Sequence, residues 1–323
     1  MPKPIVTVTI VTWNSERMLR ACLDSLFAQT LTDVEVIVVD NNSTDQTLTI
    51  LQNYPLLTLF KQTSNLGFCK AHNLAISYAQ GKYVLPLNPD IIMTETYLEK
   101  LIQVAENEAQ VGIVAGKLLL KDPNALAEAN LLLDSTGLFL EKTRRQFLRG
   151  HREPESDRYQ QQEFVFGADG AAPLYRRQML QDCQFEGQYF DETFFAYKED
   201  VDLAWRAQLF GWKSVYTPDA IAFHLRTFKP GQRQGLSKGV RLHSVKNRYL
   251  LLIKNELGHT FIRHALHILF YDLKILIYLL LFEQSSLLGL YQALRFLPQA
   301  LRWRKFIMAH KKVDGPYMLA WMK

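Results

Sequence analysis

Short apolar segments alternate with amphipathic segments from residue 5 to residue 87. Residues 5–12 (IVTVTIVT) and 34–40 (VEVIVVD) are rich in β-branched side chains and predict strands that are buried on both faces. Between them, residues 14–30 place apolar side chains at helical spacing, with Asn14 or Ser15 as the expected N-cap. The rhythm continues through a helix at 43–55, a strand at 57–62, a helix at 68–81 and a strand at 82–87. This alternation predicts an α/β fold with a mostly parallel, Rossmann-like sheet and flanking helices.

The composition provides enough apolar material for such a core. Of 323 residues, 48% are hydrophobic and 21% are charged, which is typical of one large globular domain or two ordinary ones. Cys22, Cys69 and Cys183 show neither disulfide nor metal-binding spacing, so we expect buried thiols in a reducing compartment. The first residues lack the features of a secretory signal, so secretion is not expected.

Charge is distributed unevenly along the chain. From Leu225 to the end, 17 Lys and Arg face 4 Asp and Glu, a balance of +13, which leaves −8 for the preceding residues because the whole chain carries +5. The basic region also contains the apolar run ILFYDLKILIYLLLF at 268–282. A solvated nucleic-acid arm would not be so apolar, so we expect a membrane surface and no nucleic acid as partner.

Polar residues follow three of the predicted strands, at the edge where parallel sheets bind ligands. They are Thr12, Trp13 and Asn14 after the first strand, Asp40 and Asn42 after the second, and Asn88, Pro89 and Asp90 after the strand at 82–87. Each alone is equally typical of a turn or a helix cap, but the recurrence at three strand ends favours a ligand site. Neither a dinucleotide-binding glycine fingerprint nor a P-loop occurs. A nucleotide would therefore be held by Asp40 and Asn42 on its base or ribose, with Trp13 nearby.

Five segments, taken in order, resemble the family 2 glycosyltransferases, which are inverting enzymes of GT-A fold. They are TIVTWNSERMLRACLDSL, VIVVDNNSTD, SNLGFCKAHNLAI, YVLPLNPD and FFAYKEDVDLAWRAQLFGWKSVYTPDAIAFH. The resemblance covers roughly residues 5–250, and the LNPD form together with the C-terminal region is similar to the bacterial rhamnosyltransferase-like branch.

The resemblance implies a site for a nucleotide-diphosphate sugar. Asp40 would contact the nucleoside base, and the same pocket would be lined by Thr12, Asn14 and Glu16, with Trp13, Asn42 and Asn88 beside them. The segment from Asn65 through Gly67 to Asn73 would lie against the diphosphate or ribose. For Asn65 and Gly67, a tight turn before a helix is an equally good interpretation.

The resemblance also implies a divalent metal ion, Mg²⁺ or Mn²⁺, as cofactor. The D-x-D motif of the family stands here as Asn88-Pro89-Asp90, so Asp90 would be the main ligand. Because hard cations keep several waters beside substrate phosphate, one carboxylate can suffice. His224 matches a histidine that completes the metal site in relatives, although a hydrogen-bonded histidine at a strand end is the alternative.

The acid pair Glu199-Asp200 follows an aromatic run and opens a predicted helix at 201–210. Asp200 matches the position of the family's general base, and Glu199 would position the acceptor or support Asp200. Burial beside Phe194, Phe195, Tyr197 and Trp205, and the second carboxylate, are expected to raise the pKa of the base. The alternative is an acidic first turn that complements the helix dipole. The spacing of Asp202 and Arg206 predicts a salt bridge.

Two further segments flank this acid pair. Gly167, Ala168, Asp169 and Gly170 match the family's wall between donor sugar and acceptor, and a strand-to-helix corner is the alternative. Residues 117–162 are charged and weakly periodic, and we interpret them as a mobile insertion that closes over substrate.

The C-terminal region predicts how the protein meets a membrane. Residues 226–248 carry seven Lys and Arg and no acid, which suits a loop near diphosphate or anionic lipid. Residues 265–282 are marginally long for a spanning helix and include three polar residues, so lying in the interface is the better prediction. A homodimer interface or a helical cap is the alternative.

The sequence therefore predicts a GT-A domain at residues 1–224, with a nucleotide-sugar half at 1–115 and an acceptor half at 163–224, and a basic, apolar helical anchor at 225–323. The predicted function is transfer of a sugar, with dTDP-rhamnose as a candidate donor, to a lipid-linked or polysaccharide acceptor. We expect this to occur peripherally at the cytoplasmic face of a bacterial inner membrane. A sugar nucleotidyltransferase and a non-catalytic scaffold are the alternatives.

Overall fold

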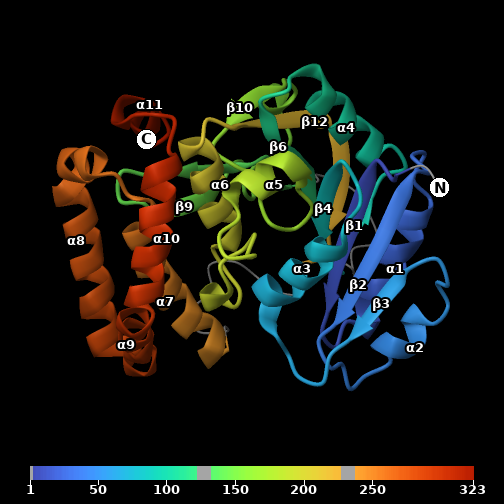
Figure 1. Cartoon of the computed structure of the whole chain (residues 1–323), viewed down its shortest axis with the longest axis horizontal. Helices are drawn as coiled ribbons and strands as arrows, with labels where there is room; N and C mark the ends of the chain where they lie inside the picture. Colours follow the sequence, from blue (N-terminus) through green and yellow to red (C-terminus); the bar gives the residue numbers. More distant parts are fainter. Residues whose placement is uncertain (1–2, 122–131, 227–236) are drawn as a thin grey trace.

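The computed structural model describes residues 3–121, 132–226 and 237–323. Its first half confirms the predicted alternation of strands and helices (Figure 1). The elements are β1 (Val6–Thr12), α1 (Glu16–Phe27), β2 (Val34–Asp40), α2 (Thr47–Leu51), β3 (Thr58–Lys61), α3 (Gly67–Tyr78) and β4 (Tyr83–Leu87). Strands β1, β2, β3 and β4 pair in parallel, with β1 between β2 and β4. Local periodicity was thus sufficient to predict this half.

Further strands widen the sheet to ten within the described residues, in the order β10-β12-β6-β11-β4-β1-β2-β3, with β5 on β12 and β7 on β6. The added elements are β5 (Ile91–Met93), α4 (Tyr97–Asn107), β6 (Val111–Leu120), β7 (Leu133–Ser135), β10 (Glu163–Val165), β11 (Leu174–Arg176) and β12 (Lys213–His224). Strand β11 runs antiparallel to both β4 and β6, whereas β12 runs parallel to β6. The fold is therefore α/β with a mostly parallel sheet, as predicted.

The strand register brings separate sequence motifs together. Thr12 pairs with Asp40 at the ends of β1 and β2. His224, the last residue of β12, pairs with Ile91 of β5, so it lies beside Asp90. Both pairs are at strand ends, where polar side chains can reach the surface of the sheet without entering the apolar core.

A smaller group of elements includes the helix that carries the acid pair. It contains the hairpin β8 (Leu138–Leu140) and β9 (Gln146–Leu148), the 3-10 turns η1 (Asp157–Tyr159) and η2 (Glu192–Phe194), and the helices α5 (Arg177–Cys183) and α6 (Glu199–Leu209). Helix α6 confirms the predicted helix, and Gly211 follows its end with φ of +82°. The predicted insertion at 117–162 contributes β8, β9 and η1 to this group and β7 to the main sheet, and its residues 122–131 lie outside the described residues.

The C-terminal helices pack against the side of the molecule opposite β2, β3 and α2 (Figure 1). They are α7 (Lys238–Asn255), α8 (Gly258–Phe282), α9 (Leu288–Arg295), α10 (Leu297–His310) and α11 (Gly315–Ala320), with the 3-10 turn η4 (Gln284–Leu287). Leu250, Trp303, Ile307 and Met318 are fully buried in the same apolar cluster as Leu203 of α6. These helices therefore share a core with the acid-pair helix and are more than an appended anchor.

Helix α8 differs from its neighbours because most of its apolar side chains face outward. Among the described residues it is the one helix that is long and apolar enough to cross a membrane, judged by length and composition, and 11% of its most apolar window is buried. Its exposed apolar residues include Leu266, Leu269, Phe270, Leu273, Ile277 and Leu281. Exposed apolar surface of this extent marks an interaction surface.

Candidate active site

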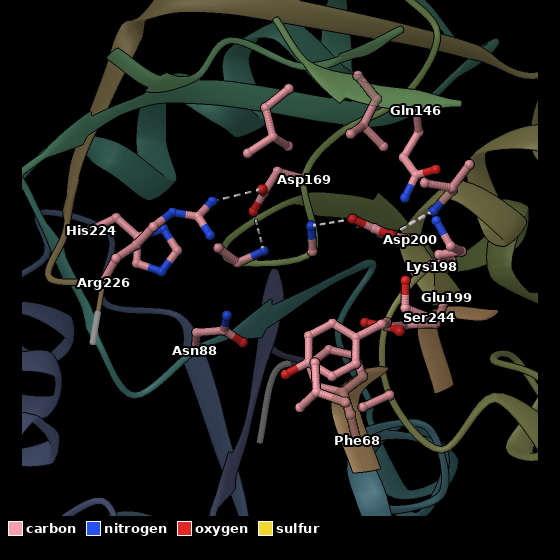
Figure 2. Close-up of a pocket in the computed structure, with 18 residues that line it drawn as sticks. Phe68, Asn88, Gln146, Asp169, Lys198, Glu199, Asp200, His224, Arg226 and Ser244 are labelled. Carbon is pink, nitrogen blue, oxygen red and sulfur yellow. Dashed lines mark hydrogen bonds and ion pairs between the residues drawn. The ribbon is translucent and has the colours of Figure 1, made fainter. Parts of the chain in front are cut away.

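A cavity of about 530 Å³ contains the acid pair. Figure 2 shows His224 and Arg226 at one end of it and Glu199, Asp200 and Lys198 at the other. Asp169 lies between the two ends, close to both Arg226 and the Gly170–Asp200 hydrogen bond. The cavity thus separates a basic end from an acidic end by a space that can hold a sugar.

The acid pair begins α6 after a strained loop. Phe195, Tyr197 and Lys198 all have backbone φ angles near +70°, which residues other than glycine seldom adopt. Such strain persists only where surrounding contacts over-determine the backbone. Here the Nδ2 of Asn247 in α7 lies 2.7 to 3.1 Å from the carbonyl oxygens of residues 194, 196 and 197. Helix α7 therefore holds the loop that aims the acid pair into the cavity.

Glu199 and Asp200 have different environments at the mouth of α6. The Oδ2 of Asp200 accepts a hydrogen bond from the Gly170 amide at 3.1 Å, and its Oδ1 accepts one from the Val201 amide at 2.7 Å. The Oε2 of Glu199 is buried and has no hydrogen-bond partner among the described residues. A buried carboxyl oxygen without a partner is costly unless a ligand or a proton satisfies it.

Both carboxyl groups are harder to ionise than in water, as predicted. Burial raises the pKa of Asp200 to about 6, and the nearby charge of Asp169 adds to this effect. Burial also raises the pKa of Glu199 to about 8, with a further contribution from Asp200. A pKa near neutrality makes a carboxylate a better proton acceptor than free aspartate.

Most of the aromatic run lies away from the cavity surface. Among the four aromatic residues named above, Tyr197 is the one that lines the cavity. Phe195 stacks on His243 and packs against Gly67, while Phe194 faces the Lys254 ammonium. Trp205 packs on Phe166 in the core. Phe194, Phe195 and Trp205 thus have contacts of their own outside the cavity lining.

The basic end of the cavity is a network around Asp134. The Oδ2 of Asp134 lies 2.7 Å from the Nδ1 of His224, and both its oxygens accept hydrogen bonds from Arg226 at 2.5 and 2.9 Å. The Nε2 of His224 lies 3.3 Å from the Oδ2 of Asp90. Burial alone would lower the pKa of His224, but the hydrogen bonds to Asp134 and Asp90 outweigh it and raise the pKa to about 9.

These residues fit the predicted metal site in one respect and limit it in another. A histidine held through Nδ1 by a carboxylate presents Nε2 to a metal ion, and Asp134 holds His224 in this way. Asp90 and His224 would be the two protein ligands. Within the described part of the chain, no group of three or more His, Cys, Asp or Glu side chains has metal-site geometry. Donor phosphate and water would therefore have to complete the coordination.

The residues predicted to bind the nucleotide form a second group at the ends of β1 and β2. The Thr12 hydroxyl donates to Asp40 Oδ1 at 2.9 Å, and the Ser43 amide donates to Asp40 Oδ2 at 3.0 Å. The side chains of Asn14 and Glu16 accept hydrogen bonds from the amides of residues 44 and 46. Trp13 and Asn42 are exposed at the same edge, and Trp13 shows 58% of its surface. Their contact with a nucleotide stays a prediction.

Asn65, Gly67 and Asn73 lie on α3 or just before it, and their environments differ. The Asn65 Oδ1 accepts from the Gly67 amide at 2.8 Å, so the turn interpretation describes this pair. Gly67 has φ of +80°, and a Cβ there would lie 2.5 Å from the Phe195 ring. The Asn73 side chain bonds the backbone of residues 189 and 190. Asn73 therefore supports the segment before the acid pair, and its contact with a donor stays a prediction.

The predicted wall separates into packing and cavity residues. Gly167 and Ala168 are packed inside the molecule, and a Cβ on Gly167 would lie 2.4 Å from that of Ala204. Asp169 and Gly170 line the cavity together with Asn88. The Asp169 side chain is buried, which raises its pKa, and it accepts from the Ala171 amide at 2.8 Å.

Asp202 belongs to the interior and not to the cavity. Its Oδ2 accepts from Arg206 Nε at 3.1 Å, which confirms the predicted salt bridge. The Lys254 ammonium and the Asn255 amide of α7 also donate to its carboxylate. The first turn of α6 thus carries two acids for the cavity and one for attachment of α7.

Several residues that line the cavity or support its lining had no recognisable pattern in the sequence. Asp134 is a single acid in a short strand, and Arg226 was expected only as part of the basic segment 226–248, of which residues 227–236 lie outside the described residues. Gln146 and Ser244 come from β9 and α7, far along the chain from the motifs. The spacing of Arg226, two residues after His224, is the sequence feature that could have predicted its place in the cavity.

The sequence is similar to known glycosyltransferases. The family model described as glycosyl transferase family 2 matches residues 7–183, more than half of the chain. N-acetylglucosaminyl-diphospho-decaprenol L-rhamnosyltransferase of Mycobacterium tuberculosis is 27% identical over 256 residues, which cover 71% of this chain and 78% of that protein.

Solved structures show the same fold at lower identity. Mannosyltransferase PcManGT from Pyrobaculum calidifontis, solved with GDP-Man and Mn²⁺, has a TM-score of 0.55 and 18% identity, with 99% of this chain and 79% of that chain covered. S. aureus TarS 1-349, solved with UDP-GlcNAc, has a TM-score of 0.54 and 17% identity, with 95% and 83% covered. From the family match and these relatives, the chain belongs to glycosyl transferase family 2 and is a glycosyltransferase.

Proposed function

We propose that this glycosyltransferase moves a sugar, with inversion at the anomeric carbon, from a nucleotide-diphosphate donor to a hydroxyl group of a lipid-linked saccharide. The observation that carries the proposal is the arrangement of the cavity, with Arg226 and His224 at one end and Asp200 at the other. Inversion requires the acceptor oxygen to attack opposite the departing diphosphate. A basic end for the diphosphate and a carboxylate at the far end satisfy this requirement.

In this mechanism Asp200 is the general base. Its carboxylate takes the proton of the acceptor hydroxyl while that oxygen forms a bond to the anomeric carbon and the bond from that carbon to the diphosphate oxygen breaks. Gly170 and Val201 hold the Asp200 oxygens through their amides. Glu199, whose Oε2 lacks a partner among the described residues, would accept or donate a hydrogen bond to the acceptor.

The leaving diphosphate would meet Arg226 and the residues that could hold a metal. Asp90 and His224 would hold a divalent cation, which when bound would neutralise charge on the diphosphate. Asp134 would keep His224 oriented for this role and fix the Arg226 guanidinium through two hydrogen bonds. The nucleoside would lie toward Asp40, Thr12 and Trp13 at the ends of β1 and β2.

The donor and acceptor classes are proposed from the relatives together with the surface of α8. The M. tuberculosis relative is named a rhamnosyltransferase acting on a diphospho-decaprenol-linked sugar, so a dTDP-rhamnose donor and a lipid-linked acceptor are the first candidates. The exposed apolar face of α8 would rest on the membrane that holds such an acceptor, at its cytoplasmic side, where nucleotide sugars are made.

Calorimetric titration with a panel of nucleotide-diphosphate sugars tests this function. The panel contains dTDP-rhamnose, GDP-mannose and UDP-N-acetylglucosamine, each with Mg²⁺, with Mn²⁺ and with chelator. We expect one donor to bind selectively and more tightly with metal. The same donor should then support transfer to a sugar-diphospho-lipid. Absence of binding by every donor in the presence of metal and acceptor would refute the proposal.

A further inference from the structure

A second cavity of about 410 Å³ lies beside the acid-pair cavity, between α7, α8 and the β8–β9 hairpin. Gln146, Lys198 and Ser244 line both cavities. The second cavity therefore adjoins the first, and residues of α8 line it. A long ligand with one end beside Asp200 would have its other end near this second cavity.

The lining of the second cavity is basic and aromatic. Arg145, Arg248 and Lys274 contribute positive charge, and Tyr271 and Tyr278 contribute rings. Arg248 is already paired, since its Nε lies 2.7 Å from Asp272 Oδ1. Arg145 and Lys274 have no ion-pair partner among the described residues, and each lies over a phenylalanine ring at 4.3 and 4.4 Å. Unpaired cations that converge on one cavity favour an anionic ligand.

The outer edge of this cavity is apolar. Phe270, Leu273 and Ile277 are next to its lining residues on α8, and 47 to 61% of each of their surfaces is exposed. A chain that leaves the cavity along α8 would cover these apolar side chains and pass the Lys274 ammonium, which lies over the Phe270 ring. Burial of a hydrocarbon chain on these side chains would add to the binding of such a ligand.

We propose that the second cavity binds the phosphate or diphosphate group that links the acceptor's sugar to its lipid, with Arg145 and Lys274 as ion-pair partners and α8 as the path of the lipid chain. This inference rests on the proposed function, because the acceptor class comes from it. It places the three parts of the acceptor in order: the sugar beside Asp200, the phosphates beside Arg145 and Lys274, and the hydrocarbon on α8. Membrane phospholipids share the phosphate-on-lipid chemistry, so the experiment must separate the two sources.

Binding of undecyl diphosphate to the full-length protein in detergent tests the proposal without requiring catalysis. The double variant Arg145→Gln/Lys274→Gln should bind it at least tenfold more weakly than the wild type. The variant Lys305→Gln/Lys311→Gln removes the same charge from exposed positions of the same region and should bind normally. Undecyl maltoside, which has the same chain and no charge, should bind weakly to all three proteins.

Three results would overturn the assignment. They are equal binding by the double variant and the wild type, equal binding of undecyl maltoside and undecyl diphosphate, and equal competition by phosphatidylglycerol, which would indicate a general phospholipid site. Inorganic pyrophosphate should compete, but more weakly, because it lacks the chain.

Donor titrations on the same samples keep the two proposals apart, since Arg145 and Lys274 lie outside the acid-pair cavity. If the wild type binds no donor, the proposed function is refuted. If it binds a donor but does not prefer undecyl diphosphate to undecyl maltoside, only this inference is refuted.

Discussion

The Nζ of Lys254 in α7 lies 2.9 Å from the Oδ2 of Asp202 in α6, and neither side chain reaches solvent. The same ammonium lies 2.7 Å from Asp191 Oδ2, in the segment that precedes the acid pair. Asp202 is two residues after Asp200, so this contact fixes the helix that aims the proposed base. Helix α7 therefore helps to position the proposed base.

Replacing Lys254 with Met should destabilise the protein strongly. The change leaves Asp191 and Asp202 buried with one cation fewer, and removing one partner of a buried ion pair costs about 3–5 kcal/mol. Urea denaturation would measure the free energy of unfolding. The exposed Lys305→Met variant is the control and should change this value little. A loss below about 1 kcal/mol for Lys254→Met would mean that α7 is held by its apolar contacts alone.

Asp200→Asn should retain donor binding and lose transfer. The amide keeps the shape of the side chain but cannot accept the proton of the acceptor hydroxyl, and loss of a general base costs about 10²- to 10⁴-fold in rate. Transfer of labelled sugar and calorimetric donor binding would be measured on the same preparation. Asp219→Asn, at an exposed position of β12, should behave as the wild type. Wild-type transfer by Asp200→Asn would exclude Asp200 as the base.

Local patterns predicted the parallel half of the fold because each of its elements carries its own periodicity. They also predicted the Asp202–Arg206 bridge, in which the partners are four residues apart. They did not predict the Asn73 or Lys254 contacts, since these join residues 52 to 117 positions apart. Such pairs depend on how the elements pack, which a single sequence does not encode locally.

The same reason explains the errors at the cavity. Of the aromatic residues near the acids in sequence, Tyr197 lines the cavity, whereas Phe194 and Phe195 contact Lys254 and His243 in a loop with several positive φ values. Asp134 was not predicted because one acid in a three-residue strand resembles any surface acid, and only the pairing of both β7 and β12 with β6 brings His224 and Arg226 to it.

Glu199→Gln should stabilise the protein at alkaline pH. Burial and Asp200 raise the pKa of folded Glu199 from 4.5 to about 8, so the folded state keeps a proton that the unfolded state has released. The free energy of unfolding therefore falls as pH rises from about 4.5 to about 8. The variant lacks this loss and should exceed the wild type by on the order of 2–4 kcal/mol above pH 8, with little difference near pH 4.

Urea titrations of both proteins at pH 4.5, 6.5 and 8.5 would measure this difference. Glu95→Gln, at an exposed position, controls for the loss of a negative charge and should follow the wild type at every pH. A gain for Glu199→Gln that is the same at all three pH values would contradict the explanation by proton binding.

Asp134→Asn should weaken the effect of metal on donor binding. The amide binds His224 and Arg226 less strongly than the carboxylate does, and loss of such a supporting group typically lowers metal affinity by about 10- to 100-fold. Donor titrations with increasing Mn²⁺ would give the metal concentration needed for half of the effect. Asp219→Asn again serves as the matched control. An unchanged Mn²⁺ requirement would show that His224 does not depend on Asp134 to act as a ligand.

The double variant Leu266→Gln/Leu273→Gln should reduce binding to lipid vesicles. Both side chains are exposed on α8, by 82% and 51%, so their loss removes apolar contact with a bilayer and leaves the protein core intact. Truncation after residue 260 would be a poorer test, because it also removes Trp303, Ile307 and Met318 from the shared core. Co-sedimentation with vesicles containing anionic lipid would be measured. Binding should fall at least tenfold, since burial of each leucine side chain contributes roughly 1.5–3 kcal/mol to the free energy of binding.

The control is Leu56→Gln/Tyr78→Gln, which removes exposed apolar groups near the other end of the molecule and should sediment like the wild type. Undiminished sedimentation of the α8 variant would assign the apolar face of α8 to another partner, such as a second copy of the chain.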